Sequence, residues 1–93
     1  MIKSFSDDKA ALLWEQKRSR RLPADIQKRA LVKLQLINAA VELDLLRLPP
    51  GNRLEALTGD RKGQYSIRIN DQWRICFVWT GTDAENVEIV DYH

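Results

Sequence analysis

The sequence has very few of the side chains that most often build metal centres. Its 93 residues include one cysteine, Cys76, and one histidine, His93. A single cysteine excludes an internal disulfide framework and a cysteine-rich zinc site, and a single histidine excludes every metal motif that needs two. We therefore expect no metal ion and no other cofactor, and acid–base chemistry would have to combine one histidine with other residue types.

Long hydrophobic runs are also missing. No apolar stretch approaches the roughly 20 residues that span a bilayer, and no apolar segment follows a basic start as in a secretory signal. Hydrophobic residues make up 44% of the chain and charged residues 30%, which is the composition of a globular protein. We expect one cytoplasmic domain over residues 1–93, because chains of this length rarely divide.

The net charge of +2 conceals an uneven distribution. Residues 17–33 hold seven basic side chains against one acidic side chain, whereas residues 75–93 hold four acidic side chains and no lysine or arginine. A basic segment of this kind attracts polyanions or acidic proteins, but it is also typical of a solvated helix face. Charge alone leaves both interpretations open.

Apolar spacing in the first half predicts two helices. Ser6 and Asp7 are candidate N-caps of the first helix, and Pro23 suits the first turn of the second. The apolar stripe of the second helix recurs at Ile26, Ala30, Leu34, Ile37 and Val41. The Leu-Pro-Pro-Gly sequence at 48–51 ends the helical region.

The second half alternates apolar and polar residues, as β-strands do. Strands are expected near residues 53–57, 64–69, 73–79 and 86–92, and residues 2–5 are a candidate first strand. Two helices followed by an antiparallel meander indicate an α+β fold with the helices on one face of the sheet.

The hairpin between the two central strands has a register that burial decides. A three-residue loop at 70–72 sets Ile67 opposite Ile75 and Ile69 opposite Trp73, so that the large apolar residues share one face. The same register sets Arg68 opposite Arg74 on the other face, where like charges repel. Either a carboxylate such as Glu88 lies between them, or an anion binds there.

The last residues bring acid–base groups to that arginine face. If Val87 and Ile89 face the core, Glu88 and Tyr92 face the arginines, and the chain continues through Asp91 to His93. Cleavage of RNA through its own 2′-hydroxyl needs a base, a cation that stabilises the charged phosphorane, and an acid. Arginine suits the second task and histidine the first or third, although a histidine in this position is by itself more typical of an exposed surface residue.

Several motifs together resemble a known toxin family. They are Gly-Asn-Arg-Leu-Glu-Ala-Leu-Thr-Gly-Asp-Arg-Lys-Gly over 51–63, Trp-Arg-Ile over 73–75 and Asp-Tyr-His over 91–93. In this order and spacing the sequence is similar to HigB-type toxins of the RelE/ParE superfamily. The resemblance implies two helices on a curved, mainly antiparallel sheet. It also implies an endoribonuclease that uses no metal and cleaves mRNA in the ribosomal A site, neutralised by a helix-turn-helix antitoxin of the HigA type that brings the complex to operator DNA.

The resemblance also assigns roles to particular residues. Arg74 matches the family's active-site arginine and is expected to hold the scissile phosphate. Tyr92 and His93 match the proton-transfer and base-stacking positions, and Asp91 either orients His93 or acts as a base. Some family members have a histidine where this chain has Glu55 and a lysine where it has Thr58. Glu55 either replaces the missing base or weakens phosphate binding.

The remaining positive charge suggests where RNA lies. Arg53, Arg61, Lys62 and Arg68 are the expected RNA contacts, and Lys17–Arg21 with Lys28 and Arg29 are further candidates for ribosomal RNA. Two alternatives stay open at this stage: a non-catalytic toxin of the same fold that inhibits gyrase, and a plain RNA- or protein-binding module. Loss of toxicity on removal of 91–93 would separate the nuclease from both.

Overall fold

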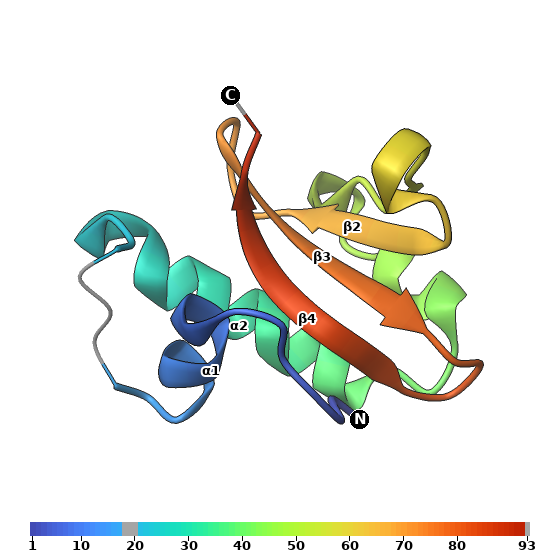
Figure 1. Cartoon of the computed structure of the whole chain (residues 1–93), viewed down its shortest axis with the longest axis horizontal. Helices are drawn as coiled ribbons and strands as arrows, with labels where there is room; N and C mark the ends of the chain where they lie inside the picture. Colours follow the sequence, from blue (N-terminus) through green and yellow to red (C-terminus); the bar gives the residue numbers. More distant parts are fainter. Residues whose placement is uncertain (18–20, 93) are drawn as a thin grey trace.

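The computed structural model describes residues 1–17 and 21–92, with helices first and strands second (Figure 1). Helix α1 spans Asp8–Trp14 and helix α2 spans Ala24–Ala39. The strands are β1 (Glu55–Ala56), β2 (Gln64–Arg68), β3 (Trp73–Trp79) and β4 (Ala84–Asp91), and short 3-10 turns lie at Leu43–Arg47, Pro50–Asn52 and Gly59–Arg61. Within the described ranges, no helix is both long and apolar enough to cross a membrane.

The four strands form one antiparallel sheet in the order β1-β2-β3-β4, which confirms the predicted meander. Helix α2 lies across one face of the sheet and α1 lies beside β4, so the α+β architecture is also confirmed (Figure 1). Among the described residues, neither α1 nor α2 covers the opposite face of β2, β3 and β4. It is this open face that holds the predicted arginines.

The two strands predicted at the margins are shorter than expected. Residues 2–5 form only isolated parallel bridges to β4, at Ile2–Ala84 and Phe5–Val87, because between them Asn86 has a left-handed backbone and donates its amide to the Ser4 hydroxyl. The strand expected at 53–57 shrinks to Glu55–Ala56, because Arg53 adopts a left-handed backbone with φ of 47° and so cannot extend it.

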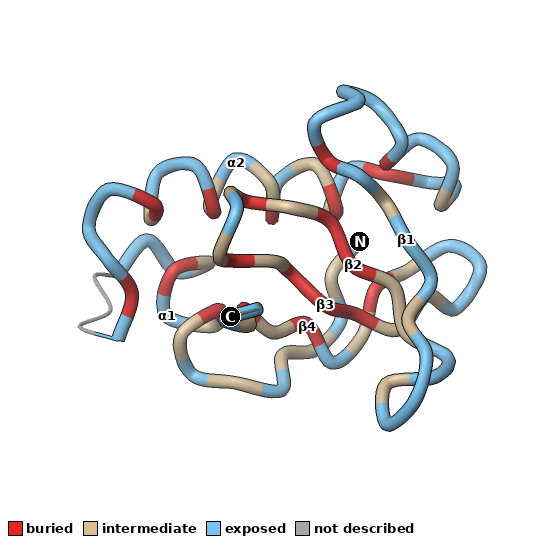
Figure 2. Tube along the Cα trace, turned by 90° about the horizontal axis from the view of Figure 1, so that it is seen from above, coloured by how far each residue is buried: buried red, intermediate tan, exposed pale blue. Residues whose placement is uncertain are grey.

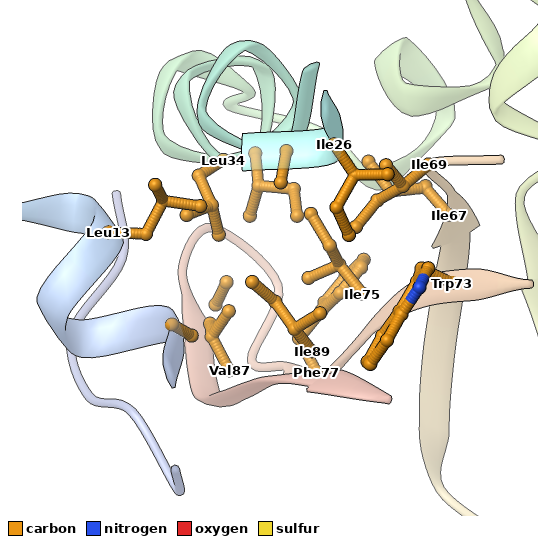
Figure 3. Packing of buried hydrophobic residues seen from close by; sticks show 14 of the residues in the cluster. Leu13, Ile26, Leu34, Ile67, Ile69, Trp73, Ile75, Phe77, Val87 and Ile89 are labelled. Atoms are coloured by element: carbon orange, nitrogen blue, oxygen red, sulfur yellow. The ribbon is translucent and has the colours of Figure 1, made fainter. Parts of the chain in front are cut away.

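The hydrophobic core lies between α2 and the sheet. In Figure 2 the buried positions of α2 face the strands, and in Figure 3 Leu13, Ile26 and Leu34 meet side chains from β2, β3 and β4. Trp73 is buried and Trp14 and Trp79 pack against this cluster, so the tryptophans are core residues. The predicted stripe was wrong at Val41, which is exposed because the helix ends at Ala39 and Ala40 is already extended.

Local hydrogen bonds fix the ends of the elements as the sequence predicts. The Asp7 carboxylate caps α1 by accepting the Ala10 amide at 2.7 Å. The three-residue hairpin loop is confirmed, since Ile67 pairs with Ile75 and the Ile69 amide donates to the Trp73 carbonyl at 2.9 Å. That register brings Arg68 opposite Arg74.

Candidate functional site

The Arg74 guanidinium is held in one orientation on the open face of the sheet. Its side chain is only 11% exposed. Nε donates to the Ser66 hydroxyl at 2.8 Å, and Nη2 donates to the Arg53 carbonyl at 2.7 Å and the Ser66 carbonyl at 3.4 Å. Several acceptors around one planar cation restrict its rotation. The carbonyl that accepts from Nη2 belongs to Arg53, the residue with the left-handed backbone.

Glu55 lies next to the same guanidinium. Strand β1 pairs Glu55 with Ser66, which places the carboxylate on the arginine face, and Oε1 is 3.5 Å from Arg74 Nη2. The Glu55 side chain is 54% exposed, so a ligand can reach it from solvent. A cation that can hold a phosphate and a carboxylate that can accept a proton are therefore adjacent.

Tyr92 is the third side chain near the Arg74 guanidinium, after Ser66 and Glu55. The Arg74 Cζ atom lies 5.6 Å from the centre of the Tyr92 ring, within cation–π range, and the Tyr92 amide donates to the Gln72 carbonyl at 2.7 Å. Burial raises the pKa of the Tyr92 phenol above its usual value of about 10. The phenol is therefore neutral at physiological pH, so Tyr92 can stack on a base or donate a hydrogen bond but does not supply a phenolate.

The carboxylates that reduce the repulsion between Arg68 and Arg74 are not the one that the sequence suggested. Glu88 does not lie between Arg68 and Arg74; it forms an ion pair with Arg61, whose Nη1 also donates to Gln64 at 3.1 Å. The hydrogen bond that Arg61 donates to the Glu88 carboxylate raises the pKa of the Arg61 guanidinium. Arg68 turns instead to Asp71 in the hairpin loop. Each arginine of the opposed pair thus has its own carboxylate partner, Asp71 for Arg68 and Glu55 for Arg74.

Asp91 lies on the other side of β4 from Tyr92. Neighbouring strand residues alternate between faces, and the Asp91 carboxylate accepts from the Gln72 side-chain amide at 3.0 Å. It lines a hollow of about 360 Å³ together with Lys9, Arg21 and Trp73 among other residues. The structure thus gives Asp91 contacts that hold the end of β4 against the hairpin loop.

The other predicted site residues differ in placement. Lys62 and Arg53 are exposed, and Arg61 is half-buried in its ion pair. His93 lies outside the described residues, as does the middle of the basic run Lys17–Arg21. In the part of the chain that the structure describes, no group of three or more His, Cys, Asp or Glu side chains could hold a metal ion.

Sequence reasoning missed Ser66. The residue is fully buried and its hydroxyl holds Arg74 Nε. The signal was present in the predicted register, which sets Ser66 opposite Cys76 and therefore diagonal to Arg74 on the same face. A small polar residue buried beside an arginine is the pattern that could have identified it.

Comparisons with known proteins agree on one family. The family described as RelE-like toxin of type II toxin–antitoxin system HigB matches residues 3–93. Toxin HigB-1 of Vibrio cholerae is 43% identical over 72 residues, covering 77% of this chain and 76% of the relative. Endoribonuclease HigB of Proteus vulgaris is 37% identical over 93 residues, covering all of both chains.

A solved structure supports the fold alone. The crystal structure of YafQ from E. coli strain BL21(DE3) superimposes with a TM-score of 0.57 and covers 99% of this chain and 94% of that one. At 14% sequence identity this likeness concerns architecture. It agrees with two helices packed on a four-stranded antiparallel sheet.

Proposed function

The chain belongs to the family of RelE-like toxins of the type II toxin–antitoxin system HigB, and from this premise we propose how its residues cleave RNA. The protein is an endoribonuclease toxin that acts on mRNA, as its HigB relatives indicate, and membership of such a system implies an antitoxin partner. The finer proposal is a single domain of residues 1–93 that cuts mRNA in the ribosomal A site, in the cytoplasm. Its antitoxin is of the HigA type, with a helix-turn-helix domain that binds operator DNA.

The anchored guanidinium of Arg74 carries the proposal. A nearly buried arginine held by the Ser66 hydroxyl and the Arg53 carbonyl needs little rearrangement when negative charge develops on a phosphate. Such preorganised donors stabilise a transition state more than mobile ones do. We therefore assign Arg74 to the scissile phosphate.

The proton transfers follow from the groups around Arg74. Glu55 removes the proton from the RNA 2′-hydroxyl, whose oxygen attacks the adjacent phosphorus. The bond from phosphorus to the 5′-oxygen then breaks, leaving a 2′,3′-cyclic phosphate, and His93 protonates the departing oxygen because imidazole titrates near neutrality. Tyr92 stacks on a base beside the cut, and Asp91 holds this end of the chain through Gln72.

The remaining basic residues hold the RNA backbone. Arg53 and Lys62 are exposed and Arg68 lies directly across the ladder from Arg74, so these side chains extend the positive surface away from the reacting phosphate. Arg61 contributes when an incoming phosphate competes with Glu88 for its guanidinium. All four contacts are sequence-neutral.

Primer extension on an mRNA in a translating extract tests the function. The wild-type chain is compared with Arg74→Ala and with a chain that lacks residues 91–93, each with and without ribosomes. We expect discrete cuts within codons only when ribosomes and the intact chain are both present. Exposed Arg47, which pairs with Asp44, supplies a matched control as Arg47→Ala. Unchanged cutting by Arg74→Ala would refute the phosphate assignment, and cutting without residues 91–93 would refute the role of the chain end.

Glu55→Gln separates the two interpretations of Glu55. The substitution keeps the size of the side chain and removes its basicity. If Glu55 is the base, the rate constant falls about 10²–10⁴-fold and the acidic limb of the pH–rate profile changes. If Glu55 only competes with phosphate for Arg74, Glu55→Gln cleaves faster than the wild type, and that result would rule out the proposed base.

A further inference from the structure

A second hollow, this one lined by several cationic side chains, lies where α2 meets the end of β2. Its volume is about 320 Å³. It is lined by Arg29, Val32, Lys33, Gly51, Arg68 and Ile69. Three of these six residues are cationic and none is acidic. Arg68 already pairs with Asp71, so Arg29 and Lys33 supply most of the positive potential that the hollow offers an anion.

Two of these cations have only neutral hydrogen-bond acceptors among the residues that the structure describes. Arg29 Nη1 donates to the Ile69 carbonyl at 3.4 Å, and Lys33 Nζ bonds the Asn52 side-chain oxygen, so both acceptors are neutral. Asn52 is buried and its amide nitrogen is already committed to the Leu46 and Leu48 carbonyls, which aims its oxygen at Lys33. Burial, with Arg29 and Arg68 nearby, lowers the pKa of the Lys33 ammonium. An anion bound here would relieve that repulsion.

The third cation links the hollow to the proposed active site. Arg68 lines the hollow and is also the cross-strand partner of Arg74. Directly opposed residues in an antiparallel ladder have Cα atoms about 4.5–5.5 Å apart. The positive surface therefore continues from Arg74 across the edge of β2 to Arg29 and Lys33 on α2.

We propose that this hollow binds a phosphate group of the RNA backbone and so anchors the substrate at a second point beside the Arg74 site. The inference rests on the proposed function, which supplies RNA as the ligand. Guanidinium groups bind phosphate through paired hydrogen bonds. No aromatic side chain lines the hollow, so it offers no surface for base stacking, and the contact is with the backbone regardless of sequence.

Binding of a fully 2′-O-methylated single-stranded RNA, measured by fluorescence anisotropy, tests the proposal. This RNA lacks the nucleophilic hydroxyl, so binding is observed without cleavage. The test variants are Arg29→Gln and Lys33→Met, and the matched controls are Arg47→Gln and Lys3→Met, which remove the same charge from other exposed positions. Between about 50 and 200 mM salt, each test variant should lower the slope of log affinity against log salt by about 0.7, and by the same amount for unrelated sequences. The controls should keep the wild-type slope.

Three results would overturn the proposal. They are no measurable binding of this RNA by the wild type at low salt, wild-type slopes in both test variants, and loss of antitoxin binding while RNA binding is kept. The last would assign the hollow to an acidic protein segment. Arg29→Gln is the variant less prone to misfold, because among the described residues the Arg29 side chain donates to a backbone carbonyl, whereas Lys33 supports the buried Asn52. If Arg74→Ala still cuts mRNA, the proposed mechanism is refuted, but the binding test of the hollow can still be interpreted because it does not depend on cleavage.

A second readout uses inorganic phosphate alone. Titrated into the wild-type protein, phosphate should shift the NMR signals of the Lys33 ε-methylene and the Arg29 Nε. The same titration of the Arg29→Gln variant should shift the Lys33 signal less. Equal shifts in the two proteins would show that Arg29 and Lys33 do not share a site.

Discussion

Replacing Ser66 by alanine should slow RNA cleavage while the fold and the charge of the site stay the same. Ser66 is fully buried, and its hydroxyl accepts the Arg74 Nε–H at 2.8 Å. The substitution deletes one oxygen and leaves the other two acceptors, the Arg53 and Ser66 backbone carbonyls, in place. The Arg74 guanidinium then keeps its charge but loses the one bond to its Nε, so its plane is held less firmly.

The structure sets the size of this effect. A hydrogen bond to a charged group contributes about 1.5–3 kcal/mol. If that energy holds Arg74 in its transition-state geometry, the single-turnover rate constant falls about 10- to 150-fold. Binding of the RNA should change less than the rate constant does, because the Arg74 charge remains.

Single-turnover cleavage of a ribosome-bound mRNA measures this rate constant. Ser6→Ala is the matched control, since the Ser6 hydroxyl is exposed and bonds the Asn86 carbonyl. Because Ser66 acts through Arg74, the double variant Ser66→Ala/Arg74→Ala should have the same single-turnover rate constant as Arg74→Ala alone. The reasoning would be refuted if a folded Ser66→Ala variant had the wild-type rate constant. It would also be refuted if the effects of Ser66→Ala and Arg74→Ala on the rate constant were fully additive in the double variant.

Three further outcomes are expected. Leu34→Ala empties a fully buried position and should lower the free energy of unfolding by about 2–5 kcal/mol, and an unchanged calorimetric melting temperature would contradict this. Asp7→Ala removes the acceptor of both the Ala10 and the Ile89 amides and should cost about 1–3 kcal/mol in urea unfolding; Asp7→Asn, which keeps one acceptor, should cost less. Because burial raises the pKa of the Tyr92 phenol, Tyr92→Phe should still stack on the base, and its pH–rate profile should match the wild type below about pH 10. Tyr92→Ala, which removes the ring, should lose activity. An alkaline limb that disappears in Tyr92→Phe would argue for an ionising phenol.

Periodicity in the sequence was sufficient to predict the two helices, the central strands and the register in which β2 pairs with β3. Only a three-residue loop lets Ile67, Ile69, Trp73 and Ile75 share the core face, and a shift of one residue would expose them all. Periodicity failed at Val41 and at Arg53, because backbone conformations at the ends of elements depend on contacts that spacing does not contain.

The candidate site, too, could be predicted from the sequence only in part. The motifs shared with a known family singled out Arg74, Glu55 and Tyr92 as candidates, and strand alternation predicted that Arg74 and Tyr92 share a face. The structure adds that Glu55 lies 3.5 Å from Arg74 Nη2. Pairing partners were beyond the sequence: Glu88 was expected near Arg68 and Arg74 and instead binds Arg61. A long side chain can choose among several carboxylates, and distances in the folded chain decide which one it meets.

The sequence by itself determined the order of elements, the apolar face of the sheet and the row of arginines on its other face, because each follows from alternation along the chain. Only the tertiary structure decided that Ser66 and the Arg53 carbonyl hold Arg74, and that Arg29 and Lys33 of α2 meet Arg68 of β2 around one hollow. Those contacts join segments up to about forty residues apart, and their geometry exists only once the core between α2 and the sheet has formed.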